Sequence, residues 1–138
     1  MGPLLSMRKA LYAALSQDAA LQTLLGGKKI FASVPPATEP PYVSFGVTRL
    51  SLWTGGSRIG HKHQIALDLW SQQPSDVELF ALAERIAVCL ETPLQPEGFA
   101  VLQCTVEAMT CQIPQADGFR QATLDVCLIT EPLHPPDQ

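Results

Sequence analysis

A change of hydrophobic period within residues 61–91 constrains the fold more than any other feature of this sequence. In "HKHQIALDLW", aliphatic residues alternate with polar or small ones, as in a strand with one buried face; the aliphatic positions are Ile65, Leu67 and Leu69. After "SQQPSD", apolar residues recur every three or four positions, as in an amphipathic helix; they are Leu79, Leu82, Ala83, Ile86 and Leu90. Ser75 and Glu78 have the spacing of a capping box at the start of this helix. The stretch therefore predicts a helix that packs on a sheet.

The N-terminal region predicts two short helices before the first strand. One helix is expected from about Ser6 to Leu15, because apolar residues recur there at helical spacing. Asp18 can cap a second helical turn, "AALQTLL", and Gly26-Gly27 ends it, since glycine adopts the left-handed closing conformation at low cost. "KKIFASV" is a short extended segment, and the prolines of "PPATEPP" predict a surface loop.

Four longer strands are predicted in two pairs. Tyr42–Trp53 and His63–Trp70 are joined by "TGGSRIGHK", which predicts a long hairpin. "FAVLQCTVEAMTCQI" and "FRQATLDVCLIT" flank the turn "PQADG". Alternation gives each strand one apolar face. Besides the residues already named, these faces are expected to hold Val43, Phe45 and Val47, then Leu102, Cys104, Val106 and Ala108, and finally Ala122, Leu124, Val126 and Leu128.

This order of elements predicts an α+β fold. We expect a mostly antiparallel sheet of about four to five strands, with an N-terminal helix and one main helix packed on one face. A chain of 138 residues suits a single hydrophobic core. Residues 1–130 are predicted to form one domain, and residues 131–138 a flexible C-terminal tail.

The composition is poor in charge, at 16% of residues, where typical domains have about 25%. Two interpretations fit: a weakly charged monomer, or a subunit that buries part of its surface against others, because interface cores are depleted in charged residues. The net charge is −4, and the nine Lys and Arg are scattered, which argues against direct nucleic-acid binding. No apolar run reaches the roughly 18 residues of a membrane span.

The sequence gives no pattern for a catalytic, metal or cofactor site. His61 and His63 are expected on one face of a strand, but a metal site needs a third or fourth ligand, and Asp68 is expected on the opposite face. "TGGSRIG" joins strand to strand, whereas a phosphate loop requires a following helix. Asp68 and Asp125 are expected on the solvated face of the sheet rather than in acid–base catalysis.

The four cysteines predict buried thiols. None belongs to a C-x-x-C pair, and free cysteine commonly behaves as a small buried apolar residue. Cys89 is expected on a helix, and Cys104, Cys111 and Cys127 on strands. A disulfide between Cys104 and Cys127 is compatible with neighbouring strands, but a cytoplasmic setting would keep it reduced.

The glycine-rich hairpin connection predicts a surface for interaction. Trp53, Arg58 and Ile59 lie beside or within it, and aromatic residues and arginine commonly anchor interfaces. His61 and His63 adjoin it and complete the predicted subunit or tube interface. The alternative is a connection that packs back onto its own domain.

Five stretches together resemble the tail completion family of tailed phages and prophages, also described as head–tail joining or tail terminator proteins. They are "ALYAALSQDAALQTLLGGKKIF", "PPATEPPYVSFG", "GHKHQIALDLWS", "SDVELFALAERIAVCLE" and "GFRQATLDVCLI". In order and spacing they cover about residues 7–130. The stretch "TGGSRIG" and the chain after Thr130 carry none of the resemblance.

The resemblance implies a non-enzymatic structural subunit without cofactor or metal, which forms a homo-oligomeric ring, commonly a hexamer, at the end of the tail tube. Implied partners are copies of itself, the tail tube protein and a neck or head completion protein, with DNA passing through the lumen. The implied location is the virion tail or head–tail junction, after synthesis in the bacterial host cytoplasm. The residues alone also allow a small-ligand-binding or regulatory α+β module with a pocket between helix and sheet, or an enzyme that uses His63.

Overall fold

The computed structural model describes residues 2–55 and 58–133. In this part of the chain, helices and strands follow one another in the predicted order. The elements are α1 (Pro3–Ser16), α2 (Ala19–Leu25), β1 (Ile30–Phe31), β2 (Tyr42–Gly55), β3 (Arg58–Ser71), α3 (Val77–Cys89), β4 (Phe99–Cys111) and β5 (Arg120–Pro132).

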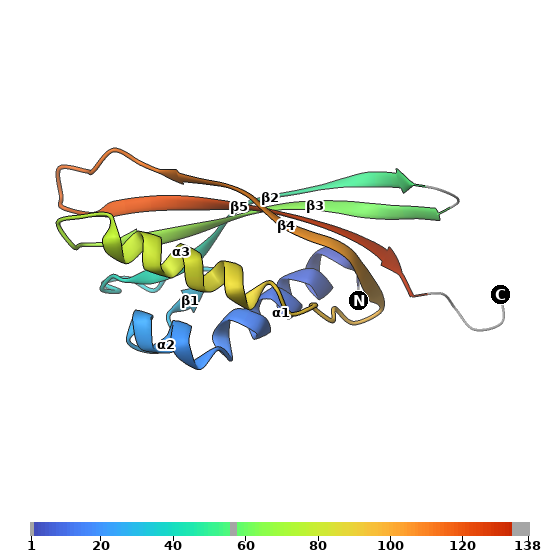
Figure 1. The fold of residues 1–138 in the computed structure, drawn as a ribbon, viewed down its shortest axis with the longest axis horizontal. Helices are drawn as coiled ribbons and strands as arrows, with labels where there is room; N and C mark the ends of the chain where they lie inside the picture. Colours follow the sequence, from blue (N-terminus) through green and yellow to red (C-terminus); the bar gives the residue numbers. More distant parts are fainter. Residues whose placement is uncertain (1, 56–57, 134–138) are drawn as a thin grey trace.

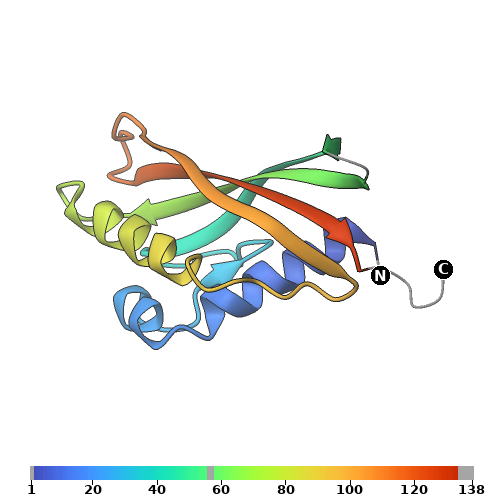
Figure 2. The same cartoon turned by 45° about the vertical axis from the view of Figure 1, so that its right-hand side comes forward.

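The strands form one mixed sheet in the order β1-β2-β3-β5-β4. β1 is parallel to β2, and the other neighbours are antiparallel. α1, α2 and α3 all lie on one side of the sheet (Figure 1), and the strands twist across this helix layer (Figure 2). The predicted α+β fold, with helices on one face of a mostly antiparallel sheet, is confirmed.

The hydrophobic core fills the space between the helix layer and the facing side of the sheet. Every apolar residue predicted for this face of β3, α3 and β5 is buried, so burial of these stripes stabilises the fold by the removal of apolar surface from water. Leu11 and Leu15 of α1, together with Leu21 and Leu25 of α2, complete the core from the N-terminal side.

The α2 boundaries are confirmed, but the predicted α3 capping box is wrong. The Asp18 carboxylate accepts a hydrogen bond from the Leu21 amide at 2.9 Å, and Gly26 ends α2 in the left-handed conformation, with φ 77°. α3 begins at Val77 without a side-chain cap. Glu78 instead accepts a hydrogen bond from the hydroxyl of the buried Ser71 at 2.6 Å, which ties the start of α3 to the end of β3.

Bulges make the predicted face assignments of β2 and β4 partly wrong. The register of β2 shifts between Phe45 and Thr48, and a bulge reverses the facing of the residues beyond it. Val47 therefore points away from the core and is 79% exposed. Two register shifts in β4 likewise leave Leu102 and Ala108 exposed. The residues of β4 that pack against the core are Val101, Cys104, Val106 and Met109.

The predicted long hairpin is confirmed. β2 and β3 pair from Tyr42 with Trp70 to Gly55 with Arg58, and the hairpin extends beyond the helix layer (Figure 1). Its tip contains Gly56 and Ser57, which lie outside the described residues. At the C-terminus, β5 continues through Pro132, two residues beyond the predicted domain boundary; residues 134–138 of the predicted tail also lie outside the described part.

Near its tip, the hairpin has no room for a side chain at Gly60. A Cβ atom there would lie 2.3 Å from the Thr130 carbonyl oxygen. Gly60→Ala is therefore expected to destabilise the protein by about 1–3 kcal/mol, the usual cost of overpacking, as measured by urea denaturation. Gly2→Ala is the control, since a Cβ at Gly2 meets nothing within 4 Å. Equal stability of the two variants would contradict the close approach of β3 to β5.

Candidate interaction surfaces

The side of the sheet that faces the core continues onto the hairpin. There it lies beyond the core and forms an apolar surface. Pairing places Leu50 opposite His63, Leu52 opposite His61, and Thr54 opposite Ile59; strand alternation puts all of these on the same side as the core residue Ile65. Leu52 is 72% exposed and Ile59 is 65% exposed. We call this surface the hairpin underside; it comprises Leu50, Leu52, Thr54, Ile59 and His61.

His63 lies where the hairpin underside meets the core. It is 1% exposed, and its Nε2 lies 3.1 Å from the Thr130 hydroxyl. The His61 and His63 ring centroids are 6.5 Å apart, and neither Nδ1 has a hydrogen-bond partner among the described residues. Burial, and secondarily the charge of His61, lowers the pKa of His63. His63 is therefore a neutral residue inside the subunit, and of the two histidines only His61 reaches the surface.

Trp53 lies on the opposite face of β2 from Leu52. A Cβ atom at Gly55 would lie 2.3 Å from the Trp53 ring, and one at Gly60 would lie 3.3 Å from it, so the indole covers both glycines of its own hairpin. Arg58 pairs with Gly55 through its backbone, and its side chain is not among the described parts of the structure. Of the predicted interface residues, the structure therefore places Ile59 and His61 together on the hairpin underside.

The sequence interpretation missed Leu50, Leu52 and Thr54 of this surface, of which Leu52 is the more exposed leucine. Steps of two back from Ile65 along β3 reach His61 and Ile59, but placing Leu52 on the same face requires the pairing register across the turn, which the structure provides. The bulge after Phe45 concealed Leu52, since uninterrupted alternation from Val43 would put it on the solvent face.

The first turns of α1 adjoin the hairpin underside. A groove of about 380 Å³ is lined by Leu4, Leu5 and Arg8 of α1 and by Thr48, His63 and Ile65 of the sheet. The Arg8 guanidinium stacks 4.3 Å from the Phe45 ring centroid and donates to the Thr48 hydroxyl at 3.4 Å. Leu4 and Leu5 are exposed, so they extend the apolar surface of the hairpin onto the helix.

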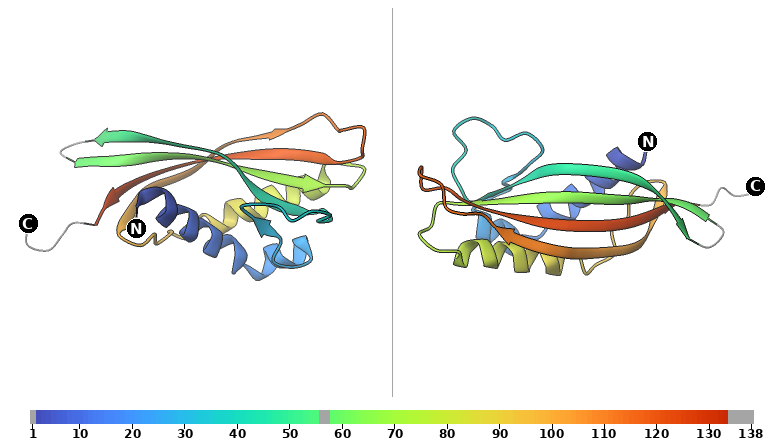
Figure 3. Two further views of the ribbon diagram at one scale, coloured as in Figure 1. Left: turned by 180° about the vertical axis from the view of Figure 1, so that it is seen from behind. Right: turned by 90° about the horizontal axis from the view of Figure 1, so that it is seen from above.

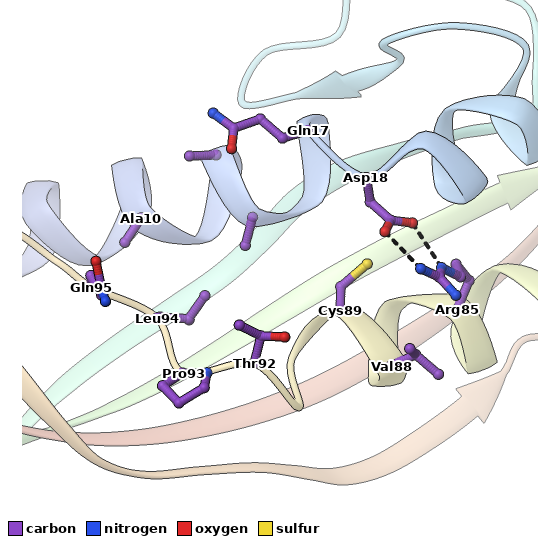
Figure 4. A pocket seen from close by; sticks show the side chains of 12 residues that line it. Ala10, Gln17, Asp18, Arg85, Val88, Cys89, Thr92, Pro93, Leu94 and Gln95 are labelled. Carbon is purple, nitrogen blue, oxygen red and sulfur yellow. Dashed lines mark hydrogen bonds and ion pairs between the residues drawn. The ribbon is translucent and has the colours of Figure 1, made fainter.

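A groove of about 580 Å³ lies between α1 and the C-terminal half of α3 (Figure 4). Arg85 donates two hydrogen bonds to the Asp18 carboxylate, both at 2.7 Å, and these bonds hold the pKa of Asp18 well below its usual range. Beside the pair, burial and then the charge of Asp18 raise the pKa of the Cys89 thiol to about 11. The thiol is therefore protonated at neutral pH and is a poor nucleophile.

Asp18→Ala is expected to lower the free energy of unfolding by about 1 kcal/mol through loss of the α2 cap, with loss of the Arg85 pair adding to the effect. Because folding depresses the pKa of Asp18, its contribution is present above the ordinary aspartate pKa of about 3.9 and is lost as the pH falls below that value. Urea denaturation should therefore show that the difference in unfolding free energy between wild type and variant shrinks as the pH falls from about 4 to about 2. Glu39→Ala, at an exposed position, is the control. A gap that stays constant with pH would contradict the ion pair.

The four cysteines are free, and Cys111 alone among them is exposed; the prediction of a buried thiol is wrong for this residue, which is the last residue of the edge strand β4. We expect a thiol reagent such as Ellman's reagent to modify one cysteine per chain rapidly in the folded protein and all four in denaturant. Cys111→Ser should abolish the rapid reaction. A rapid reaction that survives this substitution would contradict the assigned burial.

The remaining side chains that could serve in catalysis or metal binding do not form such a site in the described part of the chain. Asp68 accepts a hydrogen bond from the Thr123 hydroxyl at 2.8 Å, whereas Asp125 lies opposite Ala66, so the two carboxylates are not directly opposite each other across β3 and β5. Within residues 2–55 and 58–133, no group of three or more His, Cys, Asp or Glu side chains is placed to hold a metal ion. Among the described helices, none has the length and apolar character needed to cross a membrane.

Comparison with protein families and solved structures gives consistent results. The family model described as "Tail completion protein gp17" matches residues 9–131. The fold is similar to a chain in the virion of a native gene transfer agent particle, with a TM-score of 0.81, 19% identity, and coverage of 91% of this chain and 94% of that one. It is also similar to the bacteriophage SPP1 gp17 protein, with a TM-score of 0.59, 18% identity, and coverage of 98% and 95%. The comparison with curated protein sequences found no match.

Proposed function

The chain belongs to the tail completion protein gp17 family, and from this premise we propose how its surfaces serve that role. It is a structural component of the tail of a phage-like virion, which joins the tail to the head, and it is not an enzyme. Its task is therefore assembly, and the residues that matter for function are those on the surfaces that meet other subunits.

We propose that copies of the chain form a closed ring, with six as the expected number from the family resemblance, and that the hairpin underside is part of the contact between neighbours. The observation that carries this proposal is the exposure of Leu52 and Ile59 on a hairpin that projects beyond the helix layer. Fully burying such a side chain stabilises a contact by about 1.5–3 kcal/mol. A contact between different surfaces of neighbouring copies closes into a ring when the rotation between them permits it.

The two faces of the ring would then have different partners. One face would bind the end of the tail tube and occupy the surface on which another tube ring would stack, so that growth stops. The other would bind a neck or head completion protein. The net charge of −4 and the scattered basic residues suit a lumen through which DNA passes without being held by its phosphates.

A deletion of the gene in the cells that make the particle tests this function. Electron microscopy of lysates should show tails separated from heads, and the wild-type gene on a plasmid should restore complete particles. The double variant Leu52→Asp/Ile59→Asp should fail to restore them. Val47→Asp is the matched control, because Val47 is exposed to a similar degree but points away from the hairpin underside; it should restore joining.

Complete particles in the deletion strain would refute a joining function for this chain. Restoration of joining by the double variant would instead refute the hairpin underside as a functional contact, while leaving the family role intact.

A further inference from the structure

We infer that each subunit carries two helix surfaces of opposite charge, and that the exposed face of α1 in one copy packs against the exposed face of α3 in the next. The inference rests on the proposed ring and identifies the surface that the hairpin and its adjoining helix meet on the neighbouring copy. The partner is a second copy of this chain.

The exposed face of α1 is apolar and basic. Its members recur at helical spacing, so they share one side of the helix; they are Leu4, Leu5, Arg8, Lys9 and Tyr12, of which Arg8 is partly buried and the others are exposed. α1 contains no acidic residue. We call this set the basic surface, and it is continuous with the hairpin underside through the groove at Leu4, Leu5 and Arg8.

The exposed face of α3 is apolar and acidic. Four members are spaced by three, four and four residues and therefore lie in one line on the helix; they are Val77, Phe80, Glu84 and Val88. The fifth, Glu91, follows two residues after α3 ends, and all five are exposed. Arg85, the one basic residue of α3, is already paired with Asp18, so it does not neutralise this side. We call this set the acidic surface. Three apolar side chains and the Glu84 carboxylate in line on α3, with Glu91 just beyond its end, complement the apolar and basic character of the basic surface.

In the described part of the subunit, the charges at the centres of the two surfaces have no salt-bridge partner. Neither Lys9 nor Glu84 takes part in a salt bridge in the described part of the chain. Two copies of the same surface would bring like charges together, which costs binding energy, whereas the basic surface on the acidic surface brings opposite charges together. The charges therefore disfavour a symmetric dimer through either surface alone and favour a head-to-tail contact, the type that generates rings.

The placement of the helices permits one copy to use both surfaces at once. Seen from above the sheet, α3 follows the β4 edge, while the first turns of α1 emerge beyond the β2 edge (Figure 3). The two surfaces thus lie toward opposite edges of the subunit, and each can meet a different neighbour.

Charge reversal tests the contact. Glu84→Lys and Lys9→Glu, each alone, are expected to raise the concentration at which the assembly dissociates by about tenfold, and the double variant should return it to within about threefold of wild type. Mass photometry over a dilution series measures the dissociation, and circular dichroism confirms that each variant is folded. Phe80→Asp is a second variant that should weaken assembly without relying on a charge pair.

The control is Glu107→Lys, which makes the same charge change at an exposed position on β4 and should leave assembly unchanged. If both Glu84→Lys and Phe80→Asp assemble like the wild type, the inference is overturned while the ring stands. The inference is also overturned if the double reversal fails to restore assembly, or if the control weakens assembly equally. A wild-type chain that never assembles would overturn the ring itself, and this contact with it.

Discussion

The Leu52→Asp/Ile59→Asp variant is expected to exist as single chains under conditions in which the wild type is a ring. Both side chains are mostly exposed in the subunit, so aspartate costs little there in the folded monomer. In the proposed contact, each carboxylate would be buried against an apolar surface, and burying a charge without a partner costs several kcal/mol. Size-exclusion chromatography with light scattering measures the loss of assembly.

Thermal unfolding of the same samples separates assembly from folding. Val47→Asp, which introduces the same charge on the other face of β2, should keep the wild-type mass. If the double variant keeps that mass as well, the hairpin underside does not hold the ring together.

The largest effect on folding is expected from Leu67→Ala, at about 3 kcal/mol, within the usual range for a buried leucine. Leu67 lies on β3 in the middle of the sheet, opposite Phe45 on β2 and Leu124 on β5, and is fully buried. Truncation there leaves a cavity that neither neighbouring strand can close without breaking its pairing. Urea denaturation gives the difference in unfolding free energy.

Leu133→Ala, the same substitution at an exposed position, is the matched control and should change stability by less than about 0.5 kcal/mol. Both are best measured in the Leu52→Asp/Ile59→Asp background, because assembly would otherwise make apparent stability depend on concentration. A Leu67→Ala variant as stable as Leu133→Ala would contradict the central place of β3 in the core.

The regular parts of the fold were predictable from the sequence because their hydrophobic period is uninterrupted. Ile65, Leu67 and Leu69 alternate without a break, and the stripe of α3 keeps its spacing from Leu79 to Leu90, so the faces they bury could be assigned directly. The same period recurs on β5 from Ala122 to Leu128. In each case, burial of one face decides the orientation, and a shift of one residue would expose the whole set.

The failures arise where tertiary contacts override a local pattern. At "FGVT", two residues of β2, Gly46 and Val47, stand against Ala66 alone on β3, and this bulge turns Val47 outward; a glycine in a strand permits a bulge but does not require one. The capping pattern at Ser75 was present, but Glu78 bonds to Ser71, which lies on an element that the local pattern does not include. The hairpin surface was predicted by residue type, and the register then placed Trp53 and Ile59 on opposite sides of it.

The complementary helix surfaces could not have been recognised from the sequence alone. The spacing of Phe80, Glu84 and Val88 is visible there, but a helix stripe becomes a candidate interface only when the opposite stripe is known to fill the core. The pairing of Arg85 with Asp18, 67 residues away in sequence, is likewise a property of the folded chain, and it is this pairing that leaves the charge of Glu84 uncompensated.

The native mass of the purified wild-type protein tests the account most directly. Native mass spectrometry or light scattering at concentrations from below micromolar to above 100 μM would report it. We expect a discrete assembly near six times the 14.9 kDa of one chain, converted to single chains by Leu52→Asp/Ile59→Asp. A mass of 14.9 kDa at every concentration would contradict a subunit whose exposed hairpin and helix faces are built to meet copies of itself.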